Sequence, residues 1–437
     1  MKSALPFLAW AIAGDRVGWY VTGVPLGLLS VSGTLPPPPD LPRFTVEAEE
    51  EPEAPPADDR HRGTGLVAHP HVFDQQRIDP DAAKVVRRLE RAGFEAYLVG
   101  GCVRDLLLDR KPKDVDICTS ARPEDMRQIF RNCRIIGRRF RLAHVLFGGG
   151  KVIEVATFRR APQDALGEVD GDIDEDLLIR NDNVFGEAHE DALRRDFTIN
   201  ALFYDLDRRR VLDWCGGMED IARRTIRTIG DPGVRFREDP IRILRAIKFA
   251  GRLDLGIDPA VWDAMVQHRG ELAKAARPRI FEEILRLMRG GAAHRSFWIL
   301  WESGGLAVLL PELSALLDDE ESNPKAVRRF WRRMDELDRR TKADGPRNDI
   351  VLVSALLREP LEEALDGVRD KGQAFGDFID PVIQRIAVPR RIADSMRRIL
   401  GMMPKIVAGR AGKFAKSELM PPALELLEIE RAARSNR

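Results

Sequence analysis

The spacing of apolar positions divides the chain into a mixed segment and a helical segment. From Ile78 to about residue 158, helical periods alternate with short runs of strand-like alternation. After HEDALRRDFTINALFYD and one further hairpin around RRRVLDWCGG, the apolar positions follow helical periods alone from about Pro240 to the end. The pattern therefore predicts an α+β chain, in which a small mixed β-sheet with helices on one side is followed by all-helical domains.

Several elements of the mixed segment have clear boundary signals. Asp79 as N-cap, Pro80 at the first helical position and Gly93 just past the end predict a helix over IDPDAAKVVRRLERAG. The strands FEAYLV and VDICT flank the short helix CVRDLLLD, and a helix opens at Pro123. FRLAHVLF and KVIEVATF are expected to pair as a hairpin around the glycines at 148–150.

Composition predicts where the chain is not folded. LPPPPDLP and EAEEEPEAPPADD combine proline and like charge with little to bury, so residues 32 to about 65 are expected to be disordered. Residues 161–183 are acidic and poor in apolar side chains, which predicts a mobile loop. The apolar run ALPFLAWAIAG stops at Asp15 and is too short to span a membrane. It favours a disordered leader or a start assigned too far upstream over a secretion signal.

Charge is balanced over the whole chain but not along it. Lysine and arginine number 70, as do aspartate and glutamate. From Pro381 to the end there are twelve basic and five acidic side chains, which is typical of a nucleic-acid footprint or of a solvated basic tail. The four cysteines, Cys102, Cys118, Cys133 and Cys215, form no CxxC pair, so a reducing cytoplasm is expected.

Two aspartates and two glycines form the candidate chemical centre. Asp114 and Asp116 share one face of the expected strand, and like charges roughly 6 to 7 Å apart repel by about 2 to 3 kcal/mol unless a cation lies between them. Mg²⁺ is the expected cation, because it binds carboxylate oxygens together with substrate phosphates. Gly100 and Gly101 permit a sharp turn before a helix N-terminus, which suits a phosphate group. Each feature alone is also typical of a plain turn or a solvated strand end. Further positive charge nearby comes from Arg104, Lys111 and Lys113.

The order of these motifs resembles that of one enzyme family. GGCVRD and KDVD match the pattern GG-x-VRD…[RK]D-x-D of nucleotidyltransferases in the DNA polymerase β superfamily, and the chain resembles their tRNA nucleotidyltransferase and bacterial poly(A) polymerase branch. RRDFTINALFYD, DWCGG, EDPIRILRAIKFAGRL and RPRIFEEILRLM follow in the order of that branch. Composition predicts a disordered or wrongly assigned leader and a Pro/Glu-rich linker over residues 1–77. The resemblance implies a catalytic head over 78–215, a nucleotide-selecting neck over 216–290, and an RNA-binding body with a basic tail over 291–437.

The resemblance also implies a reaction and a set of site residues. The 3′-hydroxyl of an RNA would join the α-phosphate of a nucleotide and release pyrophosphate, with two Mg²⁺ ions stabilising the entering and leaving oxygens. Asp114 and Asp116 would bind metal, and Glu154 would be the third catalytic carboxylate or else an ordinary surface residue. The residues expected to bind the nucleotide are Gly100, Gly101, Arg104, Lys113, Arg159, Arg195, Asp196, Asn200, Asp239, Arg242 and Arg245.

The hydrogen-bonding groups of two of these residues indicate which nucleobase the site accepts. Asp239 and Arg242, three apart on a helix, offer a hydrogen-bond acceptor beside a donor, which matches the pairing edges of adenine and cytosine but not those of guanine and uracil. Asp239 also precedes Pro240 and could instead cap its own helix. Asp196 and Asn200, expected to contact the sugar, could instead lie on an exposed helix face.

The pair alone leaves the product open between poly(A) tails and CCA ends. RNCRIIGRRFRLAHVLF is similar to a stretch of bacterial poly(A) polymerases and favours addition of AMP from ATP to RNA 3′ ends, whereas Cys102 matches neither branch. The alternatives are a CCA-adding or A-adding tRNA enzyme and a non-catalytic RNA-binding protein on the same scaffold. We expect no membrane partner, and we expect that removal of the residues after Met403 weakens RNA binding while sparing nucleotide binding.

Overall fold

The structure, a computed structural model, describes residues 9–13, 16–20, 61, 63–137, 141–160 and 184–435. The chain divides into two compact units, Met1–Pro56 and Ala57–Arg437. In the first unit, β1 (Ala9–Ala13) pairs antiparallel with β2 (Arg16–Tyr20). The expected loop at 161–183 and most of the expected disordered segment lie outside the described residues, so both stay predictions.

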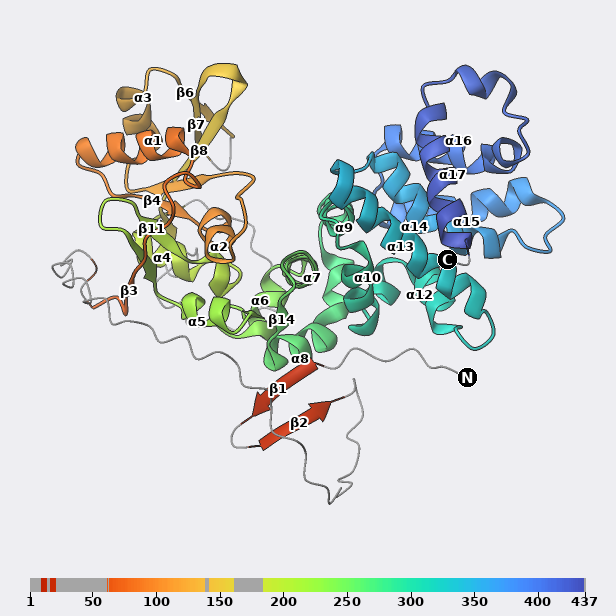
Figure 1. Ribbon diagram of the computed structural model, residues 1–437, viewed down its shortest axis with the longest axis horizontal. Helices are drawn as coiled ribbons and strands as arrows, with labels where there is room; N and C mark the ends of the chain where they lie inside the picture. Colours follow the sequence, from red (N-terminus) through yellow and green to blue (C-terminus); the bar gives the residue numbers. More distant parts are fainter. Residues whose placement is uncertain are drawn as a thin grey trace, which may run out of the picture. The chain divides into compact units, whose positions relative to one another are not determined.

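The second unit opens with an eight-stranded mixed sheet (Figure 1). Its strand order is β3-β12-β11-β4-β5-β8-β7-β6, and every neighbouring pair is antiparallel except β5 and β8. The predicted mixed sheet is therefore confirmed. Its strands are β3 (Val67–Pro70), β4 (Ala96–Val99), β5 (Asp116–Thr119), β6 (Cys133–Ile136), β7 (Leu142–Leu146), β8 (Val152–Thr157), β11 (Phe203–Asp205) and β12 (Arg210–Asp213).

The sheet starts earlier in the chain than the sequence indicated. β3 pairs with β12, and Phe73 is buried in the core, so the folded part begins before Ile78. β3 is a short edge strand whose side chains are mostly exposed, and it therefore lacks the apolar alternation that marks the inner strands. The predicted hairpin of β7 and β8 is confirmed, with a 3-10 turn at Gly148–Gly150 between the strands.

Helices cover both faces of this sheet, although the sequence predicted only one. Ala96 and Leu98 of β4 pack in the cluster that contains the buried side of α1 (Pro80–Arg91). Tyr97 and Val99 alternate to the other face and pack with Ala188 of α4 (Ala188–Leu193). Because a central strand is apolar on both sides, the sheet needs a cover on each face. The short helices α2 (Gly101–Leu107) and α3 (Pro123–Ile129) complete the predicted set.

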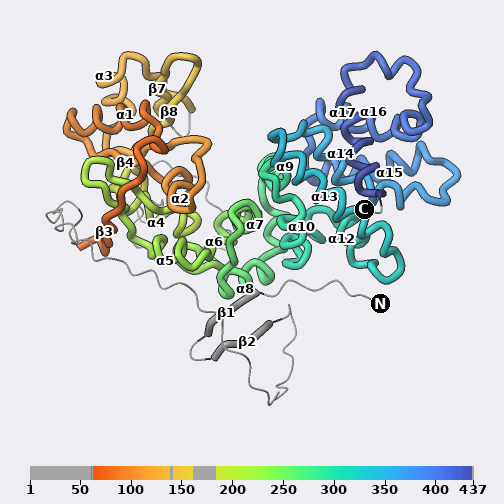
Figure 2. The backbone as a smooth tube through the Cα atoms, in the orientation of Figure 1, coloured from red at the N-terminus to blue at the C-terminus, as the bar shows by residue number. Residues whose placement is uncertain are grey.

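After β12 the described chain is helical, as predicted, apart from two-residue strands β13 (Thr225–Ile226) and β14 (Gly256–Ile257), which pair in parallel. α7 packs against α9, and the two helices are neighbours in Figure 2. No helix of the described residues is long and apolar enough to cross a membrane. The helices are α5 (Gly217–Ala222), α6 (Pro232–Glu238), α7 (Ile241–Leu253), α8 (Pro259–His268), α9 (Arg277–Arg289), α10 (Ala293–Glu302), α11 (Gly305–Leu309), α12 (Pro311–Asp318), α13 (Pro324–Asp344), α14 (Asp349–Ala364), α15 (Lys371–Arg385), α16 (Arg390–Val407) and α17 (Met420–Arg434).

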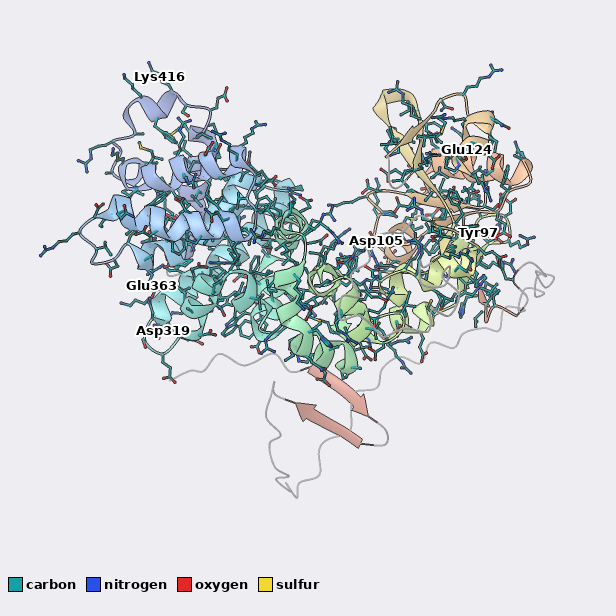
Figure 3. The ribbon with its side chains drawn as sticks, turned by 180° about the vertical axis from the view of Figure 1, so that it is seen from behind. Tyr97, Asp105, Glu124, Asp319, Glu363 and Lys416 are labelled. Atoms are coloured by element: carbon teal, nitrogen blue, oxygen red, sulfur yellow. The ribbon has the colours of Figure 1, made fainter. Side chains whose placement is uncertain are left out.

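The basic C-terminal tail is part of the helical core rather than a separable appendage. α17 packs against α13 and α14, and its residues Ala423, Leu426 and Ile429 are fully buried. Lys416, labelled in Figure 3, lies on the exposed turn before α17. Removal of the residues after Met403 would expose the apolar sides of α13 and α14, so we correct the expectation that this truncation tests RNA binding alone.

Candidate functional site

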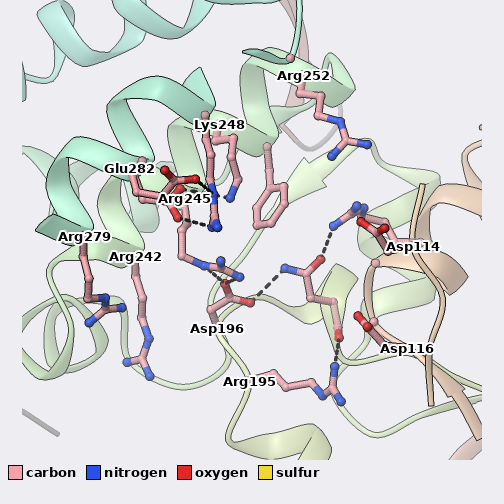
Figure 4. A pocket seen from close by; sticks show the side chains of 18 of the residues that line it. Asp114, Asp116, Arg195, Asp196, Arg242, Arg245, Lys248, Arg252, Arg279 and Glu282 are labelled. Atoms are coloured by element: carbon pink, nitrogen blue, oxygen red, sulfur yellow. Dashed lines mark hydrogen bonds and ion pairs between the residues drawn. The ribbon is translucent and has the colours of Figure 1, made fainter. Parts of the chain in front are cut away.

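One pocket gathers most of the residues predicted from the sequence. It has a volume of about 1050 Å³ and lies among α2, the start of β5, the segment 194–200, α7 and α9 (Figure 4). Its lining contains eleven basic and six acidic side chains, and this surplus of positive charge suits a polyanionic ligand. Twelve of the fourteen predicted residues line it, namely Gly100, Gly101, Arg104, Lys113, Asp114, Asp116, Arg195, Asp196, Asn200, Asp239, Arg242 and Arg245.

Gly100 provides the sharp turn between β4 and α2. Its φ of 68° lies in the left-handed region that other residues rarely adopt. A Cβ atom here would lie 2.8 Å from Nη1 of Arg195, and the amide donates to the carbonyl of Leu202 at 3.0 Å. The position therefore needs glycine both for its backbone conformation and for the close approach of a charged side chain.

Gly100→Ala is expected to lower the free energy of unfolding by about 1 to 3 kcal/mol, because the backbone would be strained and the Arg195 guanidinium displaced. Gly101→Ala is the matched control, since its Cβ would meet Nη2 of Arg104 at 3.6 Å, an ordinary contact. Urea unfolding of both variants measures the difference. Equal stability of the two variants would contradict this account of Gly100.

Asp114 and Asp116 lie together at the pocket wall, but they do not share a strand. β5 begins at Asp116, opposite Val99 at the end of β4, and Asp114 lies in the bend that precedes the strand. The prediction of one shared strand face is therefore wrong. Because the chain turns away at Gly100, β4 offers no partner to Asp114. Both carboxylates nevertheless line the pocket (Figure 4).

The surroundings of Asp116 disfavour its negative charge. Burial raises the pKa of Asp116, the neighbouring charge of Glu154 raises it further, Arg195 opposes the shift and Asp114 adds to it. Glu154 lies opposite Asp116 in the ladder of β5 and β8. A divalent cation held by Asp114 and Asp116 would relieve this repulsion, so the donor set fits Mg²⁺. In the described ranges, no three His, Cys, Asp or Glu side chains group as metal ligands, and the fit rests on two carboxylates.

Two predicted residues lie outside the pocket lining. The carboxylate of Glu154 is half-exposed and lies 3.6 Å from Nε2 of His144. Arg159, in β9 (Arg159–Arg160), is buried, and its amide donates to Oδ1 of Asp191 at 3.2 Å. Glu154 lies outside the lining, although its charge acts on Asp116, and the predicted roles of Glu154 and Arg159 stay predictions.

A buried polar network joins the segment 194–200 to α2 and α7. Asp196 accepts hydrogen bonds from Nε of Arg245 at 2.6 Å, from Nδ2 of Asn200 at 2.9 Å and from the amide of Phe197 at 2.9 Å. Burial opposes the ionisation of Asp196, but these partners lower its pKa to about 2. Oδ1 of Asn200 accepts from Nη1 of Arg104 at 2.6 Å. Asp196 and Asn200 therefore do not lie on an exposed helix face.

Three cations surround the ring of Phe249 on α7. Cζ of Arg104 lies 4.9 Å from the ring centre, Cζ of Arg245 5.5 Å and Nζ of Lys248 4.8 Å. The negative face of an aromatic ring attracts such cations. Lys248 also forms an ion pair with Glu283 of α9 at 3.1 Å, while burial and the charge of Arg245 lower the pKa of Lys248 to about 8. One ring and its cations thus connect α2, α7 and α9.

The predicted base-reading pair lines the pocket, but its members have separate partners. Oδ2 of Asp239 accepts from Nη2 of Arg279 at 2.8 Å, and Oδ1 accepts from the amide of Ile241 at 3.3 Å. Arg242 donates from Nη1 to Glu238 at 2.7 Å. One oxygen of Asp239 therefore caps the start of α7 while the other faces α9. The capping role and a pocket role are both compatible with this geometry.

The sequence analysis missed the contribution of α9 and of the C-terminal half of α7. The signal was present, because positions 242, 245, 249 and 252, and likewise 279, 282, 286 and 289, recur at helical spacing and place charged and aromatic side chains on one face. The lining residues missed in this way are Lys248, Phe249, Arg252, Arg279, Glu282, Glu283, Arg286 and Arg289.

Comparison with protein families identifies two segments of the chain. Residues 96–227 match the model described as "Poly A polymerase head domain", and residues 254–317 match "Probable RNA and SrmB- binding site of polymerase A". The first match contains β4, β5 and the segment 194–200. The second match begins after α7.

Individual proteins are similar over most of the chain. Poly(A) polymerase I of Salmonella typhimurium is 36% identical over 405 residues, which cover 90% of this chain and 86% of that protein. The CCA-adding enzyme of Geobacillus stearothermophilus is 38% identical over 234 residues, covering 54% of this chain and 55% of that protein. Among solved structures, the CCA-adding enzyme of Bacillus stearothermophilus in complex with CTP is 28% identical with a TM-score of 0.58, covering 82% of this chain and 80% of that one.

Proposed function

The chain belongs to the poly(A) polymerase family, and from this premise we propose that it adds AMP from ATP to the 3′ ends of RNA without a template. The observation that carries the proposal is the pocket itself, whose lining is predominantly positively charged. The same pocket is lined by the glycine turn, by the two aspartates and by Asp239 with Arg242. The sequence similarity to Poly(A) polymerase I extends over 90% of the chain, whereas the sequence similarity to the CCA-adding enzyme of Geobacillus stearothermophilus covers 54% of it.

The reaction joins the RNA 3′ oxygen to the α-phosphorus of ATP. The bond from that phosphorus to the oxygen bridging the α- and β-phosphates breaks, pyrophosphate leaves, and the hydroxyl proton is released. Gly100 and Gly101 let the backbone approach the phosphates at the start of α2, and Lys113 and Arg195 supply positive charge at the pocket wall. The hydrogen bonds around Asp196 and the cations at Phe249 hold α2 and the segment 194–200 in place against α7.

Asp114 and Asp116 would hold the Mg²⁺ ions that we expect this reaction to need. When bound, two such ions stabilise charge on the entering and leaving oxygens. Burial and the charge of Glu154 raise the pKa of Asp116, so a cation bound there would favour its ionised form. The two aspartates would therefore bind the Mg²⁺ ions and fix their position, and Glu154 adds negative charge from the neighbouring strand.

Asp239 and Arg242 would select the base. A carboxylate offers about four acceptor positions, so Asp239 can keep its bonds to Arg279 and Ile241 and still accept from the amino group of adenine. Arg242 uses only Nη1 in its bond to Glu238, and its other nitrogens can donate to a ring nitrogen. The same geometry accepts cytosine, which keeps a CCA-adding activity as the second candidate.

The test incubates the purified protein with Mg²⁺ and each of the four nucleoside triphosphates, using an unstructured RNA and a tRNA that lacks its 3′ end. Long heterogeneous tails on the unstructured RNA with ATP alone would support the proposal. Additions that stop after one to three nucleotides and occur only on tRNA would support the CCA-adding or A-adding alternative. Absence of any incorporation would refute both.

The affinity for ATP is expected to fall as the pH rises through about 8, because Lys248 loses its proton there. A bound triphosphate favours the charged ammonium, so binding takes up protons and weakens once the group is neutral. Titrations of ATP from about pH 7 to about pH 9 measure the change. Lys248→Arg is the control, since arginine stays charged and should bind equally across this range. The same pH dependence in both proteins would exclude Lys248 as its source.

We place the protein in the cytoplasm. All four cysteines are free, which suits a reducing compartment.

A further inference from the structure

A second positively charged pocket lies in the helical body and shares no residue with the catalytic pocket. It has a volume of about 350 Å³ and lies between the start of α13 and the end of α17. Five of its six lining residues are basic and none is acidic, a composition that suits phosphate groups. The lining residues are Lys325, Arg328, Arg329, Arg332, Ala433 and Arg434.

Two of these five cations are free to meet a ligand. Arg329 and Arg434 are paired with glutamates of α14, and Arg332 donates to a backbone carbonyl near the C-terminus. Lys325 and Arg328 are exposed, and the side chain of neither forms a hydrogen bond or an ion pair with any residue that the structure describes. The pocket thus holds positive charge that the fold does not neutralise.

A cluster of aromatic rings begins about one helical turn from Arg328, which is one of the lining residues of this pocket. Trp331 follows Arg328 by three residues on α13, so the two side chains are neighbours on the helix surface. The ring of Trp331 lies 5.4 Å from that of Trp298 and 6.2 Å from that of Trp301, both on α10, and it stacks on His294 at 4.9 Å. Positive charge and aromatic surface are therefore adjacent.

Trp298 is the open member of a well-anchored cluster. It is 41% exposed, whereas two other rings of the cluster, Trp301 and His294, have polar anchors. Nε1 of Trp301 donates to Asp318 at 2.8 Å, and Nδ1 of His294 lies 2.6 Å from Oδ1 of Asp335. Trp298 exposes its indole to solvent while its neighbours hold it in place. Such a side chain loses little conformational entropy when another ring stacks on it.

We propose that α10, α13 and the end of α17 form a second binding site for single-stranded RNA, with a base stacking on Trp298 and phosphates entering the pocket beside Lys325 and Arg328. Stacking rings beside a positively charged groove are the combination by which proteins bind single strands without sequence preference. The inference rests on the proposed function, because it places RNA upstream of the reacting 3′ end. It extends beyond residues 254–317, since α13 and α17 follow that segment. A protein partner is the other possible occupant, but a lining with five basic residues of six and no carboxylate favours a polyanion.

The test measures binding of a long unstructured oligoadenylate to the full chain by fluorescence anisotropy at several salt concentrations. Lys325→Glu/Arg328→Glu is expected to weaken binding at least about tenfold at low salt and to reduce the slope of log affinity against log salt by about 1.4, the value for two phosphate contacts on a single strand. Trp298→Ala should weaken binding about fivefold to 150-fold, whereas Trp298→Phe keeps a stacking ring and should retain most of the affinity.

A matched control reverses the charge of two arginines on α1, outside both pockets. Arg87 and Arg91 are exposed on α1 and line neither pocket, so Arg87→Glu/Arg91→Glu should leave oligoadenylate binding nearly unchanged. With a primer too short to leave the catalytic pocket, all variants should keep the KM for ATP and the kcat of the unchanged protein. This separates loss of the second site from damage to the first.

The outcomes distinguish this inference from the proposed function. If the unchanged protein extends RNA but the Lys325/Arg328 and Trp298→Ala variants bind oligoadenylate as it does, the second site is refuted, the surface is left to a protein partner, and the proposed function stands. If those variants lose binding while the unchanged protein incorporates no AMP, the second site stands and the proposed function fails.

Discussion

Asp116→Asn is expected to incorporate AMP at least about 10³-fold more slowly than the unchanged protein, because bound Mg²⁺ contributes several kcal/mol of charge stabilisation and each 1.36 kcal/mol corresponds to a factor of ten. Asparagine keeps the shape of the side chain but removes the charge that holds the ion. The rate of incorporation from ATP at saturating Mg²⁺ measures the effect, and oligoadenylate affinity should stay nearly unchanged because Asp116 adds no positive charge for RNA.

The control is Asp109→Asn, on the same connection between α2 and β5. Asp109 is 93% exposed in its side chain, pairs with Arg77 and has a φ of 57°, a conformation that asparagine tolerates well. It lies outside the pocket lining, so its variant should retain full activity. An active Asp116→Asn protein would refute the assignment of Asp116 as a metal ligand.

Asp196→Ala is expected to lower the free energy of unfolding by about 2 to 3 kcal/mol. The variant leaves the guanidinium of Arg245 and the amide of Asn200 without their acceptor in the interior of the pocket wall. The figure lies below the 3 to 5 kcal/mol typical of a fully buried pair, because Arg245 is 31% exposed in its side chain and water can reach it. Urea unfolding at neutral pH measures the loss, and Asp263→Ala, at an exposed position of α8, is the control that should change little.

Acid should remove the difference between the two proteins. The pKa of Asp196 is lowered from 3.8 to about 2, so its stabilising contribution is complete above about pH 4 and is lost as the pH falls through about 2. The unchanged protein should therefore lose its advantage over Asp196→Ala in that interval. An advantage that persists below about pH 2 would mean that packing, and not the charge of Asp196, produces it.

Local signals in the sequence were sufficient for most elements of the head. Asp79 accepts hydrogen bonds from the amides of Asp81 and Ala82, as expected of the N-cap that the sequence predicted. The glycines at 148–150 close the predicted hairpin of β7 and β8. Such signals depend on neighbouring residues only, and they failed where a partner distant in sequence decided the outcome. β3 is a strand because β12 lies beside it, and Asp114 is not in a strand because β4 has already ended.

The site divides in the same way. Gly100, Gly101, Asp114, Asp116, Asp196 and Asn200 were predicted from motif order and spacing, and all of them line the pocket. Their contacts could not be predicted, because each joins residues far apart in the chain. Arg279 reaches Asp239 across 40 positions, and Lys248 reaches Glu283 across 35.

The sequence by itself determined the kind of chain, the order of most of its elements and the identity of most groups that line the pocket, since helix periods, caps, turns and charged residue types are properties of short segments. Only the tertiary structure decided that α7 and α9 close the pocket together, that Asp196 is held ionised by Arg245, and that the basic tail is packed into the body. These features follow from burial, which depends on how distant segments pack and which no local pattern encodes.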